Sequence, residues 1–313
     1  MKTPILRPAT EAVLFGFERI GMIIRIAWLP IVLSIGLFVG SYWLLVGGNG
    51  PEFSDFNLND PEQIFEGLIA SPGFVSYYLL QVTLLPLLAS LILSCVYVAA
   101  TRASTLADYE PPNMPFYFAL GGREIRYFIV RILYFILLIV ASALIGSVGL
   151  GVAAITIGAL DAVDGEGAPL MISLAVAVGF CLFVAWLWVV VRFLPVLPIA
   201  AIENRISFGD AWKMTKGNFW RLVMSGAMFL AIMEGVLFVF LLALFLPAII
   251  VLGLIAAIGA SIAGPGALIV LTPLVIIAIV AVVVIAAFAL AARSAYTGRI
   301  YAYLSGCGEA CKI

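Results

Sequence analysis

Few ionisable side chains of this 313-residue chain fall within its long apolar blocks, and Glu234 is the most deeply placed of them. It lies about a dozen residues past Arg221, which corresponds to a depth of about 20 Å at a helical rise of about 1.5 Å per residue. A charge at that depth is costly, so an acid there is either a coupling or selectivity residue or a protonated, hydrogen-bonded side chain that is merely tolerated. Both hypotheses have equal support from the sequence.

Arg192 lies nearer the end of another apolar block, in the stretch Trp186–Pro195. An arginine in this position is able to pair with an acid or with a lipid phosphate. Extension of its long side chain toward the membrane surface explains it more simply.

The residues needed for common catalytic chemistry are missing. The chain contains no histidine, which excludes metalloprotease motifs and Ser-His-Asp triads. It has no phosphate-binding loop, and the pair Cys307 and Cys311 supplies too few ligands for structural zinc. We therefore expect a protein that is not an enzyme and that uses no cofactor or metal.

The elements that must position these residues follow from composition. Hydrophobic residues make up 65% of the chain and charged residues only 11%, and several apolar runs exceed the roughly 20 residues that cross a bilayer core as a helix. We predict an all-α, polytopic membrane protein that forms a single transmembrane domain over residues 1–313, with six transmembrane helices. The predicted spans are 22–46, 74–100, 127–160, 169–198, 222–256 and 269–298.

Basic residues are confined to one set of connectors. None of the 16 Lys and Arg residues falls in the segments 47–73, 161–168 or 257–268. The positive-inside rule then predicts a multi-pass protein of the bacterial inner membrane with both termini in the cytoplasm. The net charge of −1 argues against a nucleic-acid partner.

Short amphipathic segments precede three of the spans, at residues 15–21, 117–126 and 212–221. The spans that follow them begin about 95–105 residues apart, so the chain is divisible into three units of interfacial helix plus hairpin. In the third unit Ser207 and Asp210 have the spacing of a capping box, which predicts a helix start at Ser207. Candidate headgroup contacts on this segment are Trp212, Lys213, Lys216, Trp220 and Arg221. Simple topological anchoring is the alternative to lipid binding.

The stretch from Phe193 to Leu222 contains "PVLPIAAIEN" followed by "AWKMTKGNFW". It resembles the central signature of a family of bacterial six-helix membrane proteins, which includes the YciC-like inner-membrane proteins and the membrane domain of some glycerophosphodiester phosphodiesterases. The resemblance implies a six-span fold and a role in membrane or envelope homeostasis. The soluble phosphodiesterase domain is missing, so that activity is not implied. Signature positions include Glu203, Asn204 and Gly217, for which a structural link between the fourth span and the interfacial helix is more plausible than headgroup binding.

Three hypotheses follow for the function. The first is a non-enzymatic protein that engages anionic membrane lipid through its basic side, in envelope homeostasis or as a scaffold. The second is a small-solute or ion transporter or channel that uses Glu234, and it requires a polar cavity reaching that side chain. The third is an accessory subunit, whose partner is a second copy or another membrane protein. Small residues of the third span would then serve for close packing, namely Ser142, Gly146, Ser147 and Gly151.

Overall fold

The structure, a computed structural model, describes residues 4–46, 83–106, 108–112, 117–162, 168–259 and 266–306. These residues form helices and connecting segments, and no strand occurs among them. The helices are α1 (Arg7–Glu18), α2 (Ile20–Val46), α5 (Leu85–Thr105), α6 (Gly122–Ala162), α7 (Ala168–Phe193), α8 (Val196–Glu203), α9 (Phe208–Met214), α10 (Phe219–Gly259) and α11 (Gly266–Leu304). The predicted all-α class is confirmed.

Six of these helices are long and apolar enough to cross a membrane: α2, α5, α6, α7, α10 and α11. The chain is therefore a multi-pass membrane protein. α6 and α10 each contain 41 residues, about twice the roughly 20 that a bilayer core of about 30 Å requires. Helices of this length fit a bilayer by tilting or by extending beyond it.

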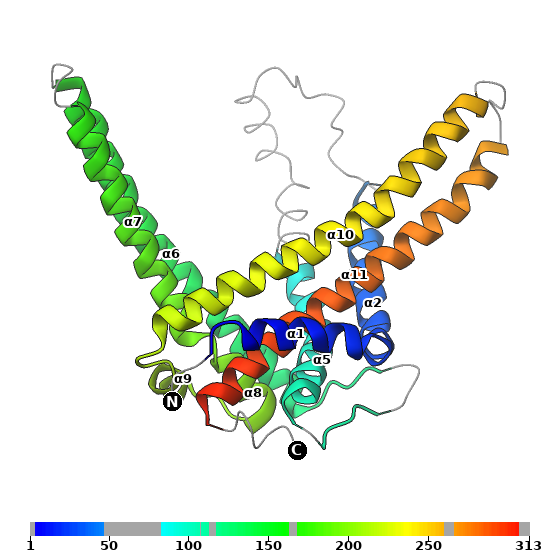
Figure 1. Ribbon diagram of the computed structural model, residues 1–313, viewed down its shortest axis with the longest axis horizontal. Coiled ribbons are helices and arrows are strands. Elements are labelled where there is room, and N and C mark those ends of the chain that lie inside the picture. Colours follow the sequence, from blue (N-terminus) through cyan, green and yellow to red (C-terminus); the bar gives the residue numbers. More distant parts are fainter. Residues whose placement is uncertain are drawn as a thin grey trace.

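The long helices meet at one end of the molecule (Figure 1). This end comprises the starts of α2, α6 and α10, the ends of α5, α7 and α11, and the short helices α1, α8 and α9. From it the hairpins α6–α7 and α10–α11 diverge. Every basic residue that the structure describes lies at this end or within about three turns of it, so we call it the basic end.

The predicted spans overlap the observed helices but differ at their ends. The span 22–46 corresponds closely to α2, and the spans 127–160, 222–256 and 269–298 lie inside α6, α10 and α11. The span 74–100 overlaps α5, whose helix continues to Thr105, whereas residues 74–82 lie outside the described residues. Apolar blocks mark the part of a helix that crosses lipid, and the hydrogen-bonded helix extends into the polar residues that flank it.

The fourth predicted span, 169–198, covers two helices and not one continuous helix. α7 ends at Phe193, a turn covers residues 194 and 195, and α8 begins at Val196. A proline disfavours helical geometry in the residue before it, and its missing N–H removes a helical hydrogen bond. Pro195 therefore divides the apolar block into two helices.

The interfacial segments differ more from the prediction. α1 spans Arg7–Glu18 and ends before residues 19–21, so the first interfacial helix begins earlier than the predicted segment 15–21. Its start coincides with Pro8, a residue favoured in the first helical turn. Residues 117–121 are not helical and α6 begins directly at Gly122, so the second predicted helix is wrong as a separate element. α9 begins at Phe208 with Ser207 as its N-cap, as predicted.

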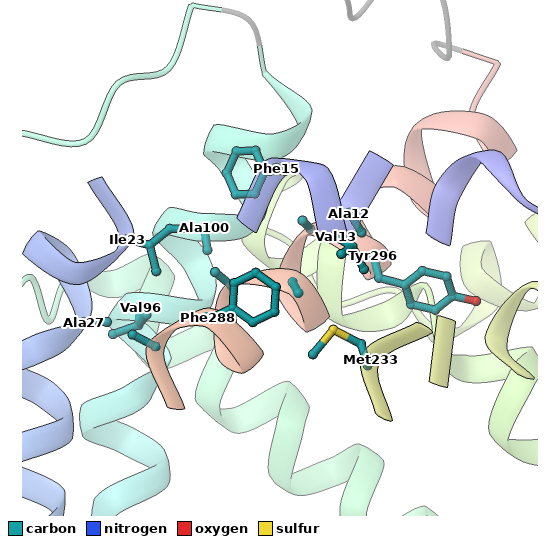
Figure 2. Close-up of a cluster of buried hydrophobic side chains, with 14 of the residues drawn as sticks. Ala12, Val13, Phe15, Ile23, Ala27, Val96, Ala100, Met233, Phe288 and Tyr296 are labelled. Carbon is teal, nitrogen blue, oxygen red and sulfur yellow. The ribbon is translucent and has the colours of Figure 1, made fainter. Parts of the chain in front are cut away.

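Among the described residues the largest fully buried side chain is Phe288 of α11, which lies in a cluster shared by α1, α2, α5, α10 and α11 (Figure 2). Phe17 of α1 packs on its ring with a centroid distance of 4.8 Å, and Phe240 of α10 lies 5.7 Å from it. A Cβ atom on Gly16 would come within 2.6 Å of the Phe288 ring. The absence of a side chain at Gly16 therefore lets α1 lie directly against α11.

α5 and α11 cross closely at Gly298. A Cβ atom at this position would lie 2.5 Å from the Thr105 hydroxyl oxygen and 3.0 Å from that of Ser104. Membrane helices use small residues at such contacts because the backbones are then able to approach one another. This crossing fixes the position of α11 against α5 at the basic end.

The two hairpins leave most of their surface uncovered by the described part of the protein. Only 6% of the most apolar stretch of α6, and 6% of that of α7, is buried. The small residues Gly146 and Gly151 have open space where a Cβ would lie, while Trp186 of α7 donates a hydrogen bond of 3.0 Å to the Ser142 hydroxyl of α6. These apolar surfaces require lipid or another membrane protein around them.

Candidate functional site

The residues that carry the predicted signature lie at the corner between α8 and α9 and at the turn between α9 and α10. Asn204 ends α8 with φ 57°, and Gly217 follows α9 with φ 83°. Both values lie in the left-handed region, which asparagine tolerates better than most residues and glycine adopts freely. The side chain of Thr215 is fully buried, and its hydroxyl donates to the Ala211 carbonyl at 3.0 Å. These positions shape the chain where it leaves α8 and where it enters α10.

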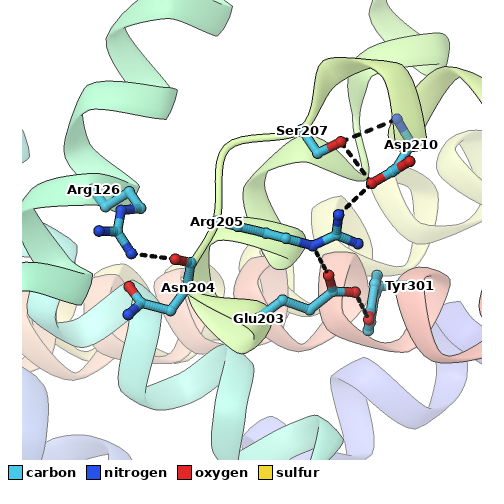
Figure 3. A network of polar contacts seen from close by, with 7 residues as sticks. All are labelled: Arg126, Glu203, Asn204, Arg205, Ser207, Asp210 and Tyr301. Atoms are coloured by element: carbon cyan, nitrogen blue, oxygen red, sulfur yellow. Dashed lines mark hydrogen bonds and ion pairs between the residues drawn. The ribbon is translucent and has the colours of Figure 1, made fainter.

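A polar network holds the same corner together (Figure 3). Arg205 pairs with Glu203 on one side and donates from Nη1 to the Asp210 carboxylate at 2.6 Å on the other. The Ser207 hydroxyl donates to Asp210 at 2.7 Å and accepts from the Asp210 backbone N–H at 3.2 Å. Tyr301 of α11 donates to the Glu203 carboxylate. The network thereby ties the start of α9 to α11.

α6 is joined to this corner by one further contact. Arg126 donates from its guanidinium to the Asn204 carbonyl oxygen. That carbonyl belongs to the residue that ends α8, where a helix leaves acceptors without partners of its own. Glu203 and Asn204 therefore have clear structural partners.

Arg192 lies against two tryptophan rings that also contact each other. Its guanidinium carbon is 4.8 Å from the centroid of the Trp212 ring and 5.3 Å from that of Trp188. The two rings meet edge to face at 4.9 Å, and Arg192 also donates to the Trp212 carbonyl at 3.2 Å. A cation stacked on aromatic rings is stabilised by about 0.5–2 kcal/mol. The fold thus brings Arg192 and Trp212 together, although the sequence patterns suggested them as candidates for separate roles.

The other candidates of this segment face outward. Lys213 and Lys216 are exposed, and Trp220 is 63% exposed. Arg221, one residue further along α10, is partly buried. Together with Trp188 and Trp212 these residues form a rim of aromatic and basic side chains around the end of α9 and the start of α10. We call this set the α9 rim.

Glu234 lies on an exposed face of α10, next to the buried Met233. It has no hydrogen bond or ion pair to another residue in the described ranges. It does not line the groove between α2, α5 and α11 or the polar pocket at the basic end. A role for Glu234 in transport therefore stays a prediction.

A polar pocket of about 480 Å³ opens at the basic end beside the α1–α2 turn and the end of α5. Its charged lining mixes bases and acids, and consists of Arg19, Arg25, Arg299, Asp108 and Glu110. The Arg102 guanidinium lies 4.0 Å from the centroid of the Tyr109 ring near this pocket. Sequence reasoning missed the pocket because its walls come from three distant segments, although the charged run 108–110 was a signal.

The pKa of Asp210 is lowered, first by the Ser207 hydrogen bond and also by Arg205. A lowered pKa in the folded state means that the carboxylate stabilises the fold above its ordinary pKa of about 3.9, and that this stabilisation is lost as the pH falls through the folded-state pKa. We expect Asp210→Asn to lower the melting temperature of the detergent-solubilised protein at pH 7. The difference from the unsubstituted protein should shrink below pH 4. Glu18→Gln, at an exposed carboxylate of α1, is the control, and an equal effect of both substitutions would contradict the role of the network.

Comparisons with known proteins add no relative. No family model matches the chain, and neither curated proteins nor solved structures include a match. The resemblance to the YciC-like proteins thus stays a prediction from the residues that carry it.

Proposed function

We propose that this chain is a non-enzymatic protein of the bacterial inner membrane that engages anionic phospholipid through its basic end. Both termini would lie in the cytoplasm. Its role would be in membrane or envelope homeostasis, either in handling lipid or as a scaffold.

The observation that carries the proposal is the gathering of the described basic residues at one end, with tryptophans among them. In the α9 rim, Lys213, Lys216 and Arg221 lie within a few residues of Trp212 or Trp220 along the chain. Trp188 joins them because its ring contacts that of Trp212. Tryptophan prefers the headgroup depth of a membrane, because its ring is apolar and its N–H is polar. A basic residue near the anionic cytoplasmic leaflet contributes about 1 kcal/mol of attraction.

The test is the lipid that accompanies the full-length protein when it is extracted into polymer discs with native membrane. We expect phosphatidylglycerol and cardiolipin to be enriched around the protein relative to the bulk membrane. Replacing Lys213, Lys216 and Arg221 together by glutamine should remove much of that enrichment, since three charges supply about 3 kcal/mol at most. Lipid mass spectrometry measures both results.

The matched control keeps the charge at the same three positions, with Lys213→Arg, Lys216→Arg and Arg221→Lys. It should retain the enrichment. The proposal would be contradicted if the discs around the unsubstituted protein had the same lipid composition as the bulk membrane. It would also be contradicted if the glutamine variant kept the same enrichment as the unsubstituted protein.

The two alternatives have less support. Transport through Glu234 has no described cavity lined by this side chain in its favour. An accessory-subunit role is compatible with the uncovered hairpin α6–α7, but lipid covers such a surface equally well.

A further inference from the structure

A groove of about 590 Å³ runs between α2, α5 and α11. Its walls are almost entirely apolar along most of its length, with contributions that include Phe38, Leu93, Val282 and Ala289. The volume falls within the roughly 300–1,000 Å³ of ordinary ligand sites. This groove lies outside the α9 rim and is not lined by any residue of it.

One end of the groove lies nearer the basic end than the other. α2 runs away from the basic end, whereas α5 and α11 run toward it. Tyr97 and Arg293 are the last groove-lining residues of α5 and α11 before the basic end. From Val282 to Arg293 the wall of α11 is about 16 Å long, which is close to half of a bilayer core of about 30 Å. The walls of α2 and α5, over residues 31–39 and 89–97, are about 12 Å long by the same rise. The groove thus fits within one leaflet, and Arg293 is the one arginine among the described residues that line it.

A second, small cavity of about 50 Å³ adjoins that mouth. It shares Tyr97 and Arg293 with the groove and adds Tyr127 and Arg131 of α6. The Arg131 guanidinium carbon lies 4.4 Å from the centroid of the Tyr97 ring, and the rings of Tyr97 and Tyr127 stack at 6.1 Å. Arg131 and Arg293, from different helices, therefore both line the small cavity that adjoins the mouth of the groove.

The positive charge at this mouth is not balanced by the described residues. No Asp or Glu lines either cavity as described. Neither Arg131 nor Arg293 has an ion pair within the described ranges, and Nη1 of Arg131 is shielded from solvent without a hydrogen-bond partner among them. Two guanidinium groups next to an apolar groove are costly unless an anion joins them. Phosphate suits such a position because guanidinium donors match its geometry.

The mouth lies near the level at which Arg192 meets Trp212. Tyr134 of α6 donates to the Val190 carbonyl of α7 at 3.1 Å, so these two residues are level. Arg131, about one turn nearer the basic end, is therefore level with the end of α7, where Arg192 stacks on Trp212. That level is the headgroup depth in the proposed orientation.

We propose that the groove holds one acyl chain of a single anionic glycerophospholipid from the cytoplasmic leaflet, with its phosphate at Arg131 and Arg293. This inference rests on the proposed function and adds a defined site to it. The acyl chain gains little by leaving the bilayer, because lipid tails are as apolar as the groove wall. Selectivity must therefore come from the headgroup charge.

The experiment uses native mass spectrometry of the full-length protein in detergent, with phosphatidylglycerol and phosphatidylcholine of identical chains as probes. We expect one tightly retained phosphatidylglycerol. The double variant Arg131→Gln, Arg293→Gln should lose about thirtyfold of the preference over phosphatidylcholine, since each arginine near anionic lipid contributes about a factor of five. Ala289→Trp, which fills the groove, should remove the retained lipid.

Two controls match these variants. Arg123→Gln removes a basic-end charge that lines neither cavity, and Ala153→Trp adds the same bulk on the exposed face of α6. Both should keep the lipid.

The glutamine variant of Lys213, Lys216 and Arg221 should also keep it while losing the surrounding anionic lipid. Retention of the lipid by the Arg131, Arg293 variant overturns the groove site. If the glutamine variant of Lys213, Lys216 and Arg221 loses the retained lipid and the Arg131, Arg293 variant does not, the groove site is also overturned. The proposed function is then unaffected.

A measurement on the unsubstituted protein avoids any failure of the variants to fold. Phosphatidylglycerol with a photoactivatable diazirine in one acyl chain should crosslink to residues 31–39, 89–97 or 282–293. Crosslinks confined to the exposed faces of α6 and α7 would overturn the proposal.

Discussion

Replacing Gly298 with leucine is expected to separate α5 from α11 and to destabilise the fold by about 3 kcal/mol, the upper end of the usual range for overpacking. Even a Cβ atom there would lie 2.5 Å from the Thr105 hydroxyl oxygen and 3.2 Å from the Thr101 carbonyl oxygen. The carbonyl belongs to the backbone of α5 and is unable to move without the helix. A leucine adds three further carbons at this contact.

The measurement is the melting temperature and the yield of monodisperse protein in detergent. Gly36→Leu on α2 is the matched control, because nothing lies within 4 Å of a Cβ at that position. We expect the control to behave like the unsubstituted protein. Equal melting of both variants would show that α5 and α11 do not cross where the structure places them.

Replacing Phe288 with alanine is expected to cost about 3 kcal/mol. Buried Phe→Ala substitutions in soluble proteins cost about 3–5 kcal/mol, and the lower end applies because the surroundings of an unfolded membrane protein are apolar as well. The substitution leaves Gly16, Phe17 and Phe240 without the ring that they pack against. α1 should therefore loosen from α11 first.

Phe238→Ala provides the comparison, since Phe238 is on the same pair of helices but 64% exposed. It should change the melting temperature little. Limited proteolysis near residues 7–18 should increase in the Phe288 variant alone. Unchanged protection of α1 in that variant would contradict the packing of α1 on the cluster.

The long helices were predictable because their signal is local. A block of about 20 apolar residues needs no knowledge of its neighbours to be placed in lipid. The N-cap at Ser207 was predictable for the same reason, since Ser207 and Asp210 lie within one turn. The end of α7 was missed because hydrophobicity continues through Pro195, and the backbone geometry of proline decides the break.

The contacts between distant segments were not predictable in this way. Stacking of Arg192 on Trp212 depends on the angle between α7 and α9, which α8 and the corner at Asn204 set. The groove requires three helices to leave a gap, and the joining of Arg131 with Arg293 requires the register of α6 against α11. Such angles and registers follow from packing, and single-sequence patterns carry little information about them.

Every functional role proposed above needs the basic end to lie in the cytoplasmic headgroup layer. The direct test is labelling of single cysteines by a membrane-impermeant maleimide in intact cells, in a variant whose four native cysteines are replaced. Cysteine at Lys216 or Ser305 should react only after the membrane is opened, and cysteine at residue 164, in a connector without basic residues, should react in intact cells. Labelling of Lys216→Cys from outside intact cells would contradict the orientation and the lipid contacts that depend on it.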